Sequence, residues 1–225
     1  PTAECPNGVV AQRMHAAAMI YVGYSFLTRM AAVAGSVADT VLKAMTDGAD
    51  VHRAYVNNGG DIALHLQEGE SYASAMVGHD GRELGQIIIQ SDHNVGGIAT
   101  SGRHGRSLSR GIADSVTVLS SCAAKADVAA TLIANAVDLM NHPAITRRPA
   151  NKVVDDSDLG NRPVVVGCGP LTQSDRNTAL RAGHDCALTM IKQNAIHAAA
   201  LFLQNDALET GSDMLISSSR TKEHA

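Results

Sequence analysis

The sequence predicts an α+β fold in which mixed or antiparallel sheets pack against alanine-rich helices. Two observations support this prediction. Short strands occur in adjacent pairs, without the regular strand–helix alternation of a parallel sheet, and two segments show the apolar spacing of amphipathic helices. The chain of 225 residues can bury one large core. We expect a single domain over residues 1–211, followed by a disordered, Ser- and charge-rich tail over residues 212–225.

The first half of the chain is expected to contain a long helix and a hairpin. Between residues 30 and 45, apolar side chains recur every three or four positions, which predicts a helix that ends near Gly48. Residues 54–58 and 62–66 flank the turn sequence Asn-Gly-Gly-Asp, which is a strong hairpin signal. The other expected segments are a loose lead-in (1–12), an apolar stretch without a clear period (13–24), and two further strands (within 68–80 and at 87–89).

The second half is organised around residues 95–131. A small-residue strand (96–101) leads into a loop rich in Gly, Ser and Arg (102–111), and a β-branched strand (115–119) precedes a helix that opens near Ser120 or Ser121. We expect this helix to end before Pro143 and to bury Ala129, Leu132, Ile133, Ala136, Val137 and Met140. The remaining expected segments are a long loop (142–162), a strand (164–166), a helix with a capping-box variant at Thr172 and Asp175 that runs to about Gln193, and a strand or short helix (196–203).

Composition excludes several classes of protein. A net charge of −4 and an aromatic content of 3% argue against a nucleic-acid platform, which needs a basic face and stacking rings. No apolar run approaches the 18 or more residues of a membrane span. The four cysteines are far apart and form no CxxC pair, so we expect a reducing, cytoplasmic location and no zinc ribbon. The alanine-rich faces suggest a homo-oligomer.

The loop over residues 102–111 is the first candidate site. Its glycines allow a close backbone approach to a ligand, and Arg103 and Arg106 offer planar guanidinium groups suited to phosphate or carboxylate. His104 could act as a general acid or base, with Ser107 as a nucleophile or hydrogen-bond donor. The alternative is a solvated polar loop. The first interpretation predicts a site for a small anionic molecule.

Two other segments could contribute to such a site. Asp127 and Thr131 are four residues apart on one helix face, so their oxygens could together bind Mg²⁺; alternatively, Asp127 is simply favoured near a helix N-terminus by the helix dipole. The sequence Asn58-Gly59-Gly60-Asp61 could place its backbone against a ligand ring or phosphate, or could be no more than a hairpin turn.

Five motifs in a fixed order resemble a known superfamily. They are A-G-S-V-A-D (34–39), V-N-N-G-G-D (56–61), A-T-S-G (99–102), V-T-V (116–118) and A-D-V-A-A-T (126–131). Over about residues 29–140 the chain is similar to the ApbE proteins, which are FAD:protein FMN transferases, and more closely to an uncharacterised branch of that superfamily. The resemblance implies an ApbE-like α+β fold, FAD or FMN as cofactor, and magnesium at Asp127 and Thr131. It also implies a flavin-nucleotide pocket lined by Gly59, Gly60, Thr100, Ser101 and Gly102.

The chain also departs from the transferase pattern. The transferases have Lys-Gly where this chain has Ala34-Gly35, and their His-x-x-Asp-Pro segment is replaced here by the Arg- and Ser-rich loop. Part of the N-terminal strands of the superfamily also has no clear counterpart. Three functions therefore remain open. They are a protein that binds a flavin or another phosphate-bearing small molecule with magnesium, an enzyme on the same scaffold that acts on a small carboxylated or heterocyclic substrate, and a non-catalytic ligand-binding homodimer.

Overall fold

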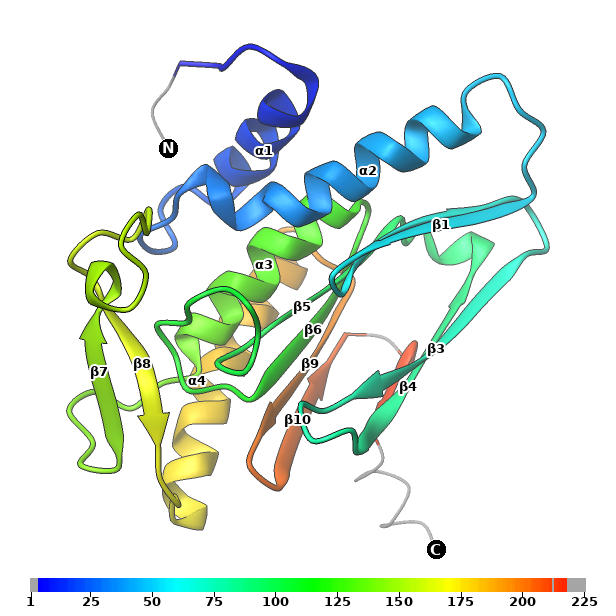
Figure 1. Cartoon of the computed structure of the whole chain (residues 1–225). Helices are drawn as coiled ribbons and strands as arrows, with labels where there is room; N and C mark the ends of the chain where they lie inside the picture. Colours follow the sequence, from blue (N-terminus) through cyan, green and yellow to red (C-terminus); the bar gives the residue numbers. More distant parts are fainter. Residues whose placement is uncertain (1–3, 212, 218–225) are drawn as a thin grey trace, which may run out of the picture.

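The computed structural model describes residues 4–211 and 213–217, and these residues form an α+β fold (Figure 1). The main sheet has six antiparallel strands in the order β1 (Arg53–Asn58), β2 (Asp61–Leu66), β5 (Gly97–Ser101), β6 (Ser115–Ser120), β9 (Ala198–Leu203) and β10 (Asp206–Thr210). A smaller antiparallel sheet has the order β11 (Leu215–Ser217), β4 (Glu83–Gln90) and β3 (Ser71–Val77), and a third pairs β7 (Ile145–Pro149) with β8 (Pro163–Cys168).

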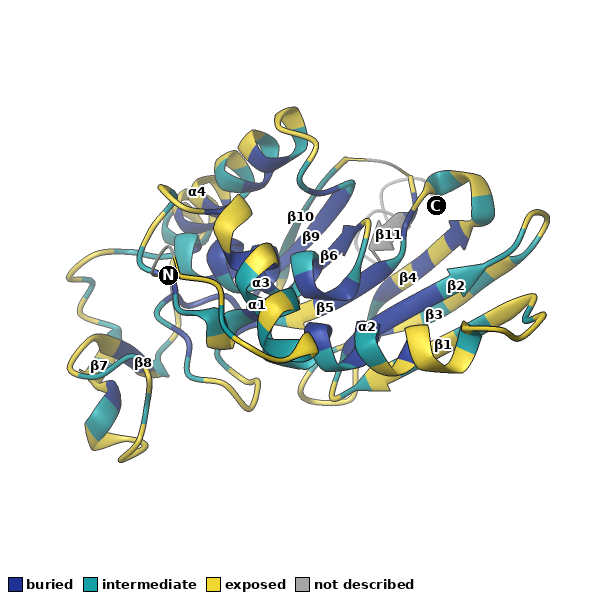
Figure 2. Cartoon of the chain, turned by 90° about the horizontal axis from the view of Figure 1, so that it is seen from above, coloured by how far each residue is buried: buried dark blue, intermediate teal, exposed yellow. Residues whose placement is uncertain are grey.

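The helices lie on one side of the main sheet and the smaller sheet lies on the other (Figure 2). The α-helices of the described residues are α1 (Val9–Ile20), α2 (Val33–Thr46), α3 (Ala123–Ala136) and α4 (Gln173–Lys192). Short 3-10 helices occur at Arg29–Ala32, Ser91–His93 and Ala150–Lys152. No helix of the described residues is both long enough and apolar enough to cross a membrane.

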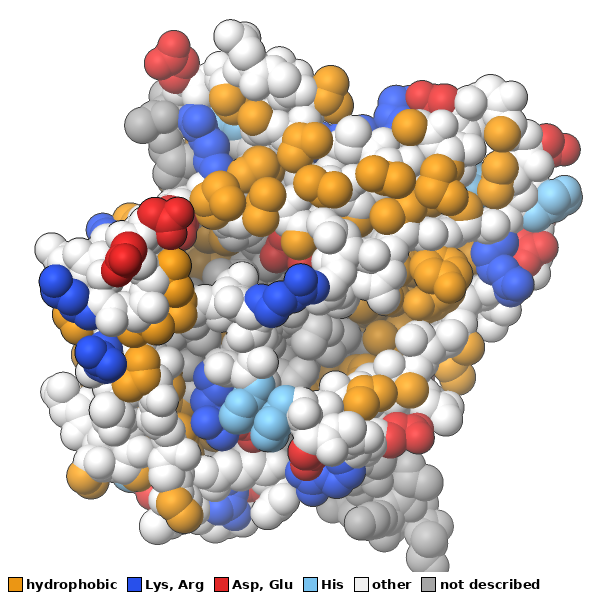
Figure 3. Space-filling model, in the orientation of Figure 1, with side chains coloured by type: hydrophobic (Ala, Val, Ile, Leu, Met, Phe, Trp, Pro, Cys, Tyr) orange, Lys and Arg blue, Asp and Glu red, His pale blue; other side chains and the backbone are white. Residues whose placement is uncertain are grey.

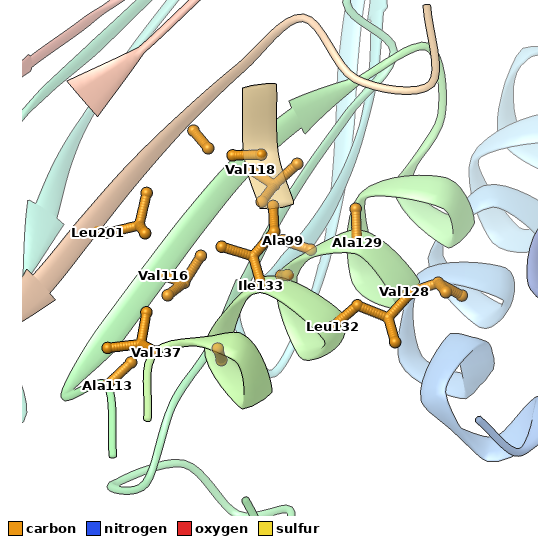
Figure 4. Packing of buried hydrophobic residues seen from close by; sticks show 14 of the residues in the cluster. Ala99, Ala113, Val116, Val118, Val128, Ala129, Leu132, Ile133, Val137 and Leu201 are labelled. Atoms are coloured by element: carbon orange, nitrogen blue, oxygen red, sulfur yellow. The ribbon is translucent and has the colours of Figure 1, made fainter. Parts of the chain in front are cut away.

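Side-chain alternation along the strands creates two separate cores. On β6, Val118 packs against the helices, while Leu119 packs against the smaller sheet. The helix-side core brings Ala129 and Ile133 of α3 under the sheet, beside Ala99 of β5 (Figure 4). Because many of these side chains are alanines, the helices approach the sheet closely. Adding even one methylene to this core is therefore expected to lower the stability of the protein.

Helices α2 and α3 are joined by contacts that use the A-G-S-V-A-D motif. A Cβ added to Gly35 would lie 2.4 Å from the carbonyl oxygen of Ala123, so only glycine permits this approach of the two backbones. The buried carboxylate of Asp39 accepts the backbone N–H groups of Ala123 and Ala124, both at 3.0 Å. Asp39 thus caps the N-terminus of α3 from a different helix, a role that Cys122 at the N-cap position does not fill with its own side chain.

Most predicted elements are confirmed. The hairpin forms with Asn58 opposite Asp61, the predicted helix over residues 30–45 corresponds to α2, and the capping box forms at Thr172 and Asp175. The segment over residues 196–203 is a strand, β9.

Four expectations need correction. The lead-in contains the start of α1 at Val9, and the expected loop over residues 142–162 contains β7. Helix α3 ends at Ala136, so Met140 lies beyond it and is 82% exposed. Residues 215–217 of the expected disordered tail form β11, which pairs with β4; residues 212 and 218–225 lie outside the described residues. The first two errors share one cause: the apolar pattern in these segments is too weak to set element boundaries without their packing partners. In the third, the apolar spacing continues through Val137 and Met140 although the helix ends at Ala136.

Candidate functional site

A cavity of about 360 Å³ opens between the main sheet and the β3–β4 hairpin. Figure 3 shows this face hollowed below α2, with histidine side chains at the lower edge of the hollow and basic side chains above them. The walls come from the β1–β2 turn, the end of β5 with the loop after it, the start of β6, and β3 with the turn that follows. The predicted site residues that line it are Gly59, Gly60, Thr100, Ser101, Gly102 and His104. Segments more than 40 residues apart in the sequence therefore meet at one cavity.

The guanidinium group of Arg106 lies against the β1–β2 turn. Gly59 has a φ of +72°, and a Cβ added to it would lie 2.1 Å from Nη2 of Arg106. Any larger residue at this position would both strain the turn and displace the arginine. Glycine at position 59 therefore leaves room for the positive charge of Arg106 beside the turn, which forms one edge of the cavity.

Arg103 and His104 share one carboxylate partner. Arg103 contacts Oδ1 of Asp114 through Nη2 at 2.7 Å and Nε at 2.8 Å, and Nε2 of His104 lies 3.2 Å from the same oxygen. The other carboxylate oxygen accepts the backbone N–H of Gln204. The charge of Arg103 is thus neutralised within the protein, so Arg106 is the better placed of the two arginines to bind an external anion.

His104 also stacks on His79 from the turn after β3. The ring centroids are 3.6 Å apart and the planes differ by 8°. Burial lowers the pKa of His104 below its ordinary value, and the charges of Arg103 and His79 lower it further, against the opposing effect of Asp114. The imidazole is therefore neutral near pH 7. In that state one ring nitrogen accepts a proton, as a general base requires.

Two carboxylates lie close together behind the Gly59–Gly60 turn. Burial raises the pKa of Asp61 despite a hydrogen bond from the backbone of Thr100 and the charge of Arg106. Burial also raises the pKa of Asp127, and the negative charge of Asp61 raises it further. The N–H of Gly35 donates to Oδ2 of Asp127 at 3.0 Å. The result is a pair of acidic groups that costs free energy when both are ionised.

Three further predicted site residues, Thr131, Asn58 and Ser107, do not line the cavity. Thr131 is half-buried one turn after Asp127, on the same helix. The amide of Asn58 donates to the carbonyl of Ala34 at 3.1 Å, which ties the turn to α2 rather than to the cavity. Ser107 is exposed and does not line the cavity, whereas Ser101 and Ser115 do.

Sequence reasoning missed several residues of the cavity, including His79, Asp114 and Ser115. His79 lies in a weakly patterned hairpin turn, and nothing near it in the sequence indicated a partner. For Asp114, a signal was present in principle, because this acid lies immediately before a predicted strand and ten residues after the Arg103-His104 pair. Among the described residues no three His, Cys, Asp or Glu side chains converge, so a metal bound here would rely on the two carboxylates, a hydroxyl, water and ligand oxygens.

The fold and cavity define an α+β protein with a cleft between two antiparallel sheets, lined by both polar and apolar residues. The family model described as "AbpE bacteria" matches residues 1–212, and the chain belongs to this family.

Curated relatives are archaeal proteins that carry the name "UPF0280 protein". The one from Methanothrix thermoacetophila is 34% identical over 165 residues, which is 71% of this chain and 63% of that protein. Those from Archaeoglobus fulgidus and Methanococcus maripaludis are 35% and 37% identical over 134 and 123 residues, covering 60% and 50% of this chain and 53% and 49% of the relatives. The matches thus span about half to two thirds of the length of these relatives.

Proposed function

We propose that this protein binds a flavin or another phosphate-bearing small molecule in the cavity between the sheets, with magnesium at Asp61, Asp127 and Thr131. The observation that carries the proposal is the arrangement at the β1–β2 turn. Two carboxylates with raised pKa values lie behind the turn, a guanidinium group lies against it, and the cavity opens beside it.

The cavity suits a flat, polar ligand. Its volume of about 360 Å³ lies in the range of small-molecule sites. Gly59, Gly60 and Gly102 contribute backbone to its walls, which lets a ring system approach without meeting side chains. The hydroxyl groups of Thr100 and Thr117 are hydrogen-bonded to each other at 3.0 Å on the main-sheet wall, and the hydroxyl that accepts in this pair can donate its own O–H to a ring or phosphate oxygen.

The carboxylate pair fits a magnesium ion. Mg²⁺ is commonly held by one or two carboxylates together with water and phosphate oxygens. Its charge would remove the repulsion that raises the pKa of Asp127, and Thr131 can add a neutral oxygen from the next turn of α3. When bound, the ion supplies positive charge toward a ligand phosphate, while Arg106 supplies a second, fixed charge. His104 can take a proton from a ligand hydroxyl at the cavity mouth.

The test is a binding titration with FAD and FMN, with and without Mg²⁺, followed by flavin fluorescence and calorimetry. We expect binding that Mg²⁺ strengthens, and we expect Asp127→Asn to abolish the magnesium effect. Arg106→Ala should weaken flavin binding about tenfold or more, as expected for loss of a charge-assisted contact. The matched controls are Asp156→Asn and Arg181→Ala, which change exposed residues of the same types. The proposal fails if neither flavin binds at 100-fold molar excess, or if the controls lose as much affinity as the site variants.

A second candidate function is favoured by the contact of His104 with Asp114. A histidine held by a carboxylate near the cavity hydroxyls of Ser101 and Ser115 is a common arrangement for proton transfer. In this case the substrate would be a small carboxylated or heterocyclic molecule bound by Arg106. Thermal stabilisation by such compounds but not by flavins, lost in Arg106→Ala, would favour this function over the first.

A further inference from the structure

A second recess lies on the helix side of the main sheet, away from the cavity described above. It encloses about 170 Å³ between the segment that follows α1, the C-terminal end of α3 and the middle of α4. Its polar lining consists of Ser25, Arg110, Asn135 and Asp138, and the rest of the wall includes Tyr24, Leu132 and Cys186. None of these residues takes part in the proposed flavin site.

Arg110 lines this recess and carries an unsatisfied donor. Its Nε atom is buried and has no hydrogen-bond partner among the described residues. A buried N–H group without an acceptor is costly, and native proteins rarely leave one unpaired. Among the described residues no acceptor therefore pairs with Nε of Arg110.

The neighbouring groups are already paired with one another. Arg147 donates through Nη2 to Asp138 at 2.5 Å and through Nη1 to the carbonyl of Arg110 at 2.7 Å. Oδ1 of Asn135 accepts the backbone N–H of Arg110 at 2.9 Å, which leaves the N–H groups of that amide as its remaining hydrogen-bonding capacity. With Asp138 neutralised by Arg147, the recess carries one net positive charge, from Arg110.

A shallow groove adjoins the recess and shares Tyr24 and Cys186 as walls with it. The groove encloses about 640 Å³, and its wall combines Ile20 and Val22, which are 44% and 56% exposed, with the polar residues Asp185, Thr189 and Gln193. The hydroxyl of Tyr24 donates to Oε1 of Gln193 at 2.6 Å, which holds the shared wall in place. A charged recess thus continues into a partly apolar surface.

We propose that the recess binds the carboxylate of a small organic acid, and that the apolar part of this acid lies in the groove of Ile20 and Val22. One net positive charge matches a singly charged carboxylate. A doubly charged phosphate is disfavoured because the one uncompensated positive charge of the recess balances only one of its negative charges, and Asp185 in the wall of the adjoining groove adds a negative charge nearby. The planar guanidinium of Arg110 and the amide of Asn135 supply the donors that carboxylate oxygens accept.

The test compares acetate, hexanoate and inorganic phosphate by NMR titration of the full chain. We expect hexanoate to bind more tightly than acetate by about tenfold, because its additional methylenes lie against the apolar groove, and phosphate to bind more weakly than either. The backbone amide signals of Ser25 and Asn135 should shift. Arg110→Gln should weaken hexanoate binding about tenfold or more, whereas the control Arg181→Gln, at an exposed position on α4, should leave it unchanged.

A second variant keeps the proposal testable if Arg110→Gln fails to fold. Ile20→Gln changes an exposed side chain and should weaken binding of hexanoate but not of acetate. The proposal is overturned if hexanoate shifts no signals at these residues, if acetate or phosphate binds as tightly as hexanoate, or if folded Arg110→Gln binds as the wild type does. Flavin binding in the Arg110→Gln variant should stay unchanged, so the outcome is independent of the proposed function of the cavity.

Discussion

Replacing Asp61 by asparagine is expected to stabilise the metal-free protein at neutral pH. The pKa of Asp61 is raised to about 7 from an ordinary value of 3.8, chiefly by burial. An Asp whose folded-state pKa is raised binds its proton more tightly in the folded state than in the unfolded state. Ionisation of this carboxyl therefore lowers the free energy of unfolding as the pH rises. The asparagine variant keeps the shape of the side chain and removes the ionisation.

The size of the effect follows from the two pKa values. A gap of about three pH units corresponds to about 4 kcal/mol, since one unit is worth about 1.4 kcal/mol. We expect a net gain in stability of about half of this value, or about 2 kcal/mol. The other half is offset because the asparagine amide places an N–H donor where the buried carboxylate had an acceptor oxygen. For a chain of this length such a change corresponds to a rise in Tm of roughly 6 °C.

The pH dependence distinguishes this mechanism from a general gain in stability. Near pH 4 and below, ionisation of this carboxyl contributes little to the free energy of unfolding, so mainly the effect of the buried amide remains and the variant should be less stable than the wild type, by up to about 2 kcal/mol. Between about pH 4 and pH 7 the difference should shift in favour of the variant, and above that range it should level off. Chemical denaturation at pH 4, 6 and 8 measures the difference, with Asp156→Asn at an exposed position as the control. A gap that is the same at all three pH values, or a variant that is less stable at pH 8, would refute the reasoning.

Three further predictions concern the supports of the site. Asp39→Ala should lower the free energy of unfolding by about 2 kcal/mol in chemical denaturation, because two backbone N–H groups at the start of α3 lose their acceptor; an unchanged midpoint would contradict the capping role. Gly35→Ala should destabilise the protein by about 2 kcal/mol despite the higher helix propensity of alanine, since the added Cβ would lie 2.4 Å from the carbonyl oxygen of Ala123; a rise in Tm would show that the helices separate freely. The pKa of His104, followed by NMR, should lie below 6.5 and should rise toward that value in His79→Ala, which removes one of the charges that lower it; a pKa above 6.5 in the wild type would contradict the partial desolvation of the ring.

Local chemistry made much of the fold predictable. The Asn-Gly-Gly-Asp turn forms the hairpin of β1 and β2 because glycines at its centre adopt positive φ angles at little cost. The apolar spacing of α2 and the capping box of α4 depend on residues within a few positions of one another. By contrast, β7 lies in a polar segment with prolines, and its pairing with β8 depends on a contact partner about 20 residues away.

The candidate site also has features that the sequence predicts and features that depend on tertiary packing. The glycine turn, the Thr-Ser-Gly strand and the Arg–His loop could each be recognised from residue type and order, because close backbone approach and anion binding require those residues locally. The stack of His104 on His79 and the pairing of Arg103 with Asp114 could not be recognised, since one depends on how the smaller sheet packs on the main sheet and the other on how the loop closes.

The sequence alone therefore determined the α+β class, the order of the main elements and the residue types of the loop over residues 102–111, which are suited to binding an anion. Only the tertiary structure decided which charges remain available. It paired Arg103 with Asp114, placed Arg106 over the glycine turn and brought Asp61 beside Asp127. The physical reason is that propensity and periodicity act over a few residues, whereas the strength of a charge depends on burial and on partners that folding brings from distant parts of the chain.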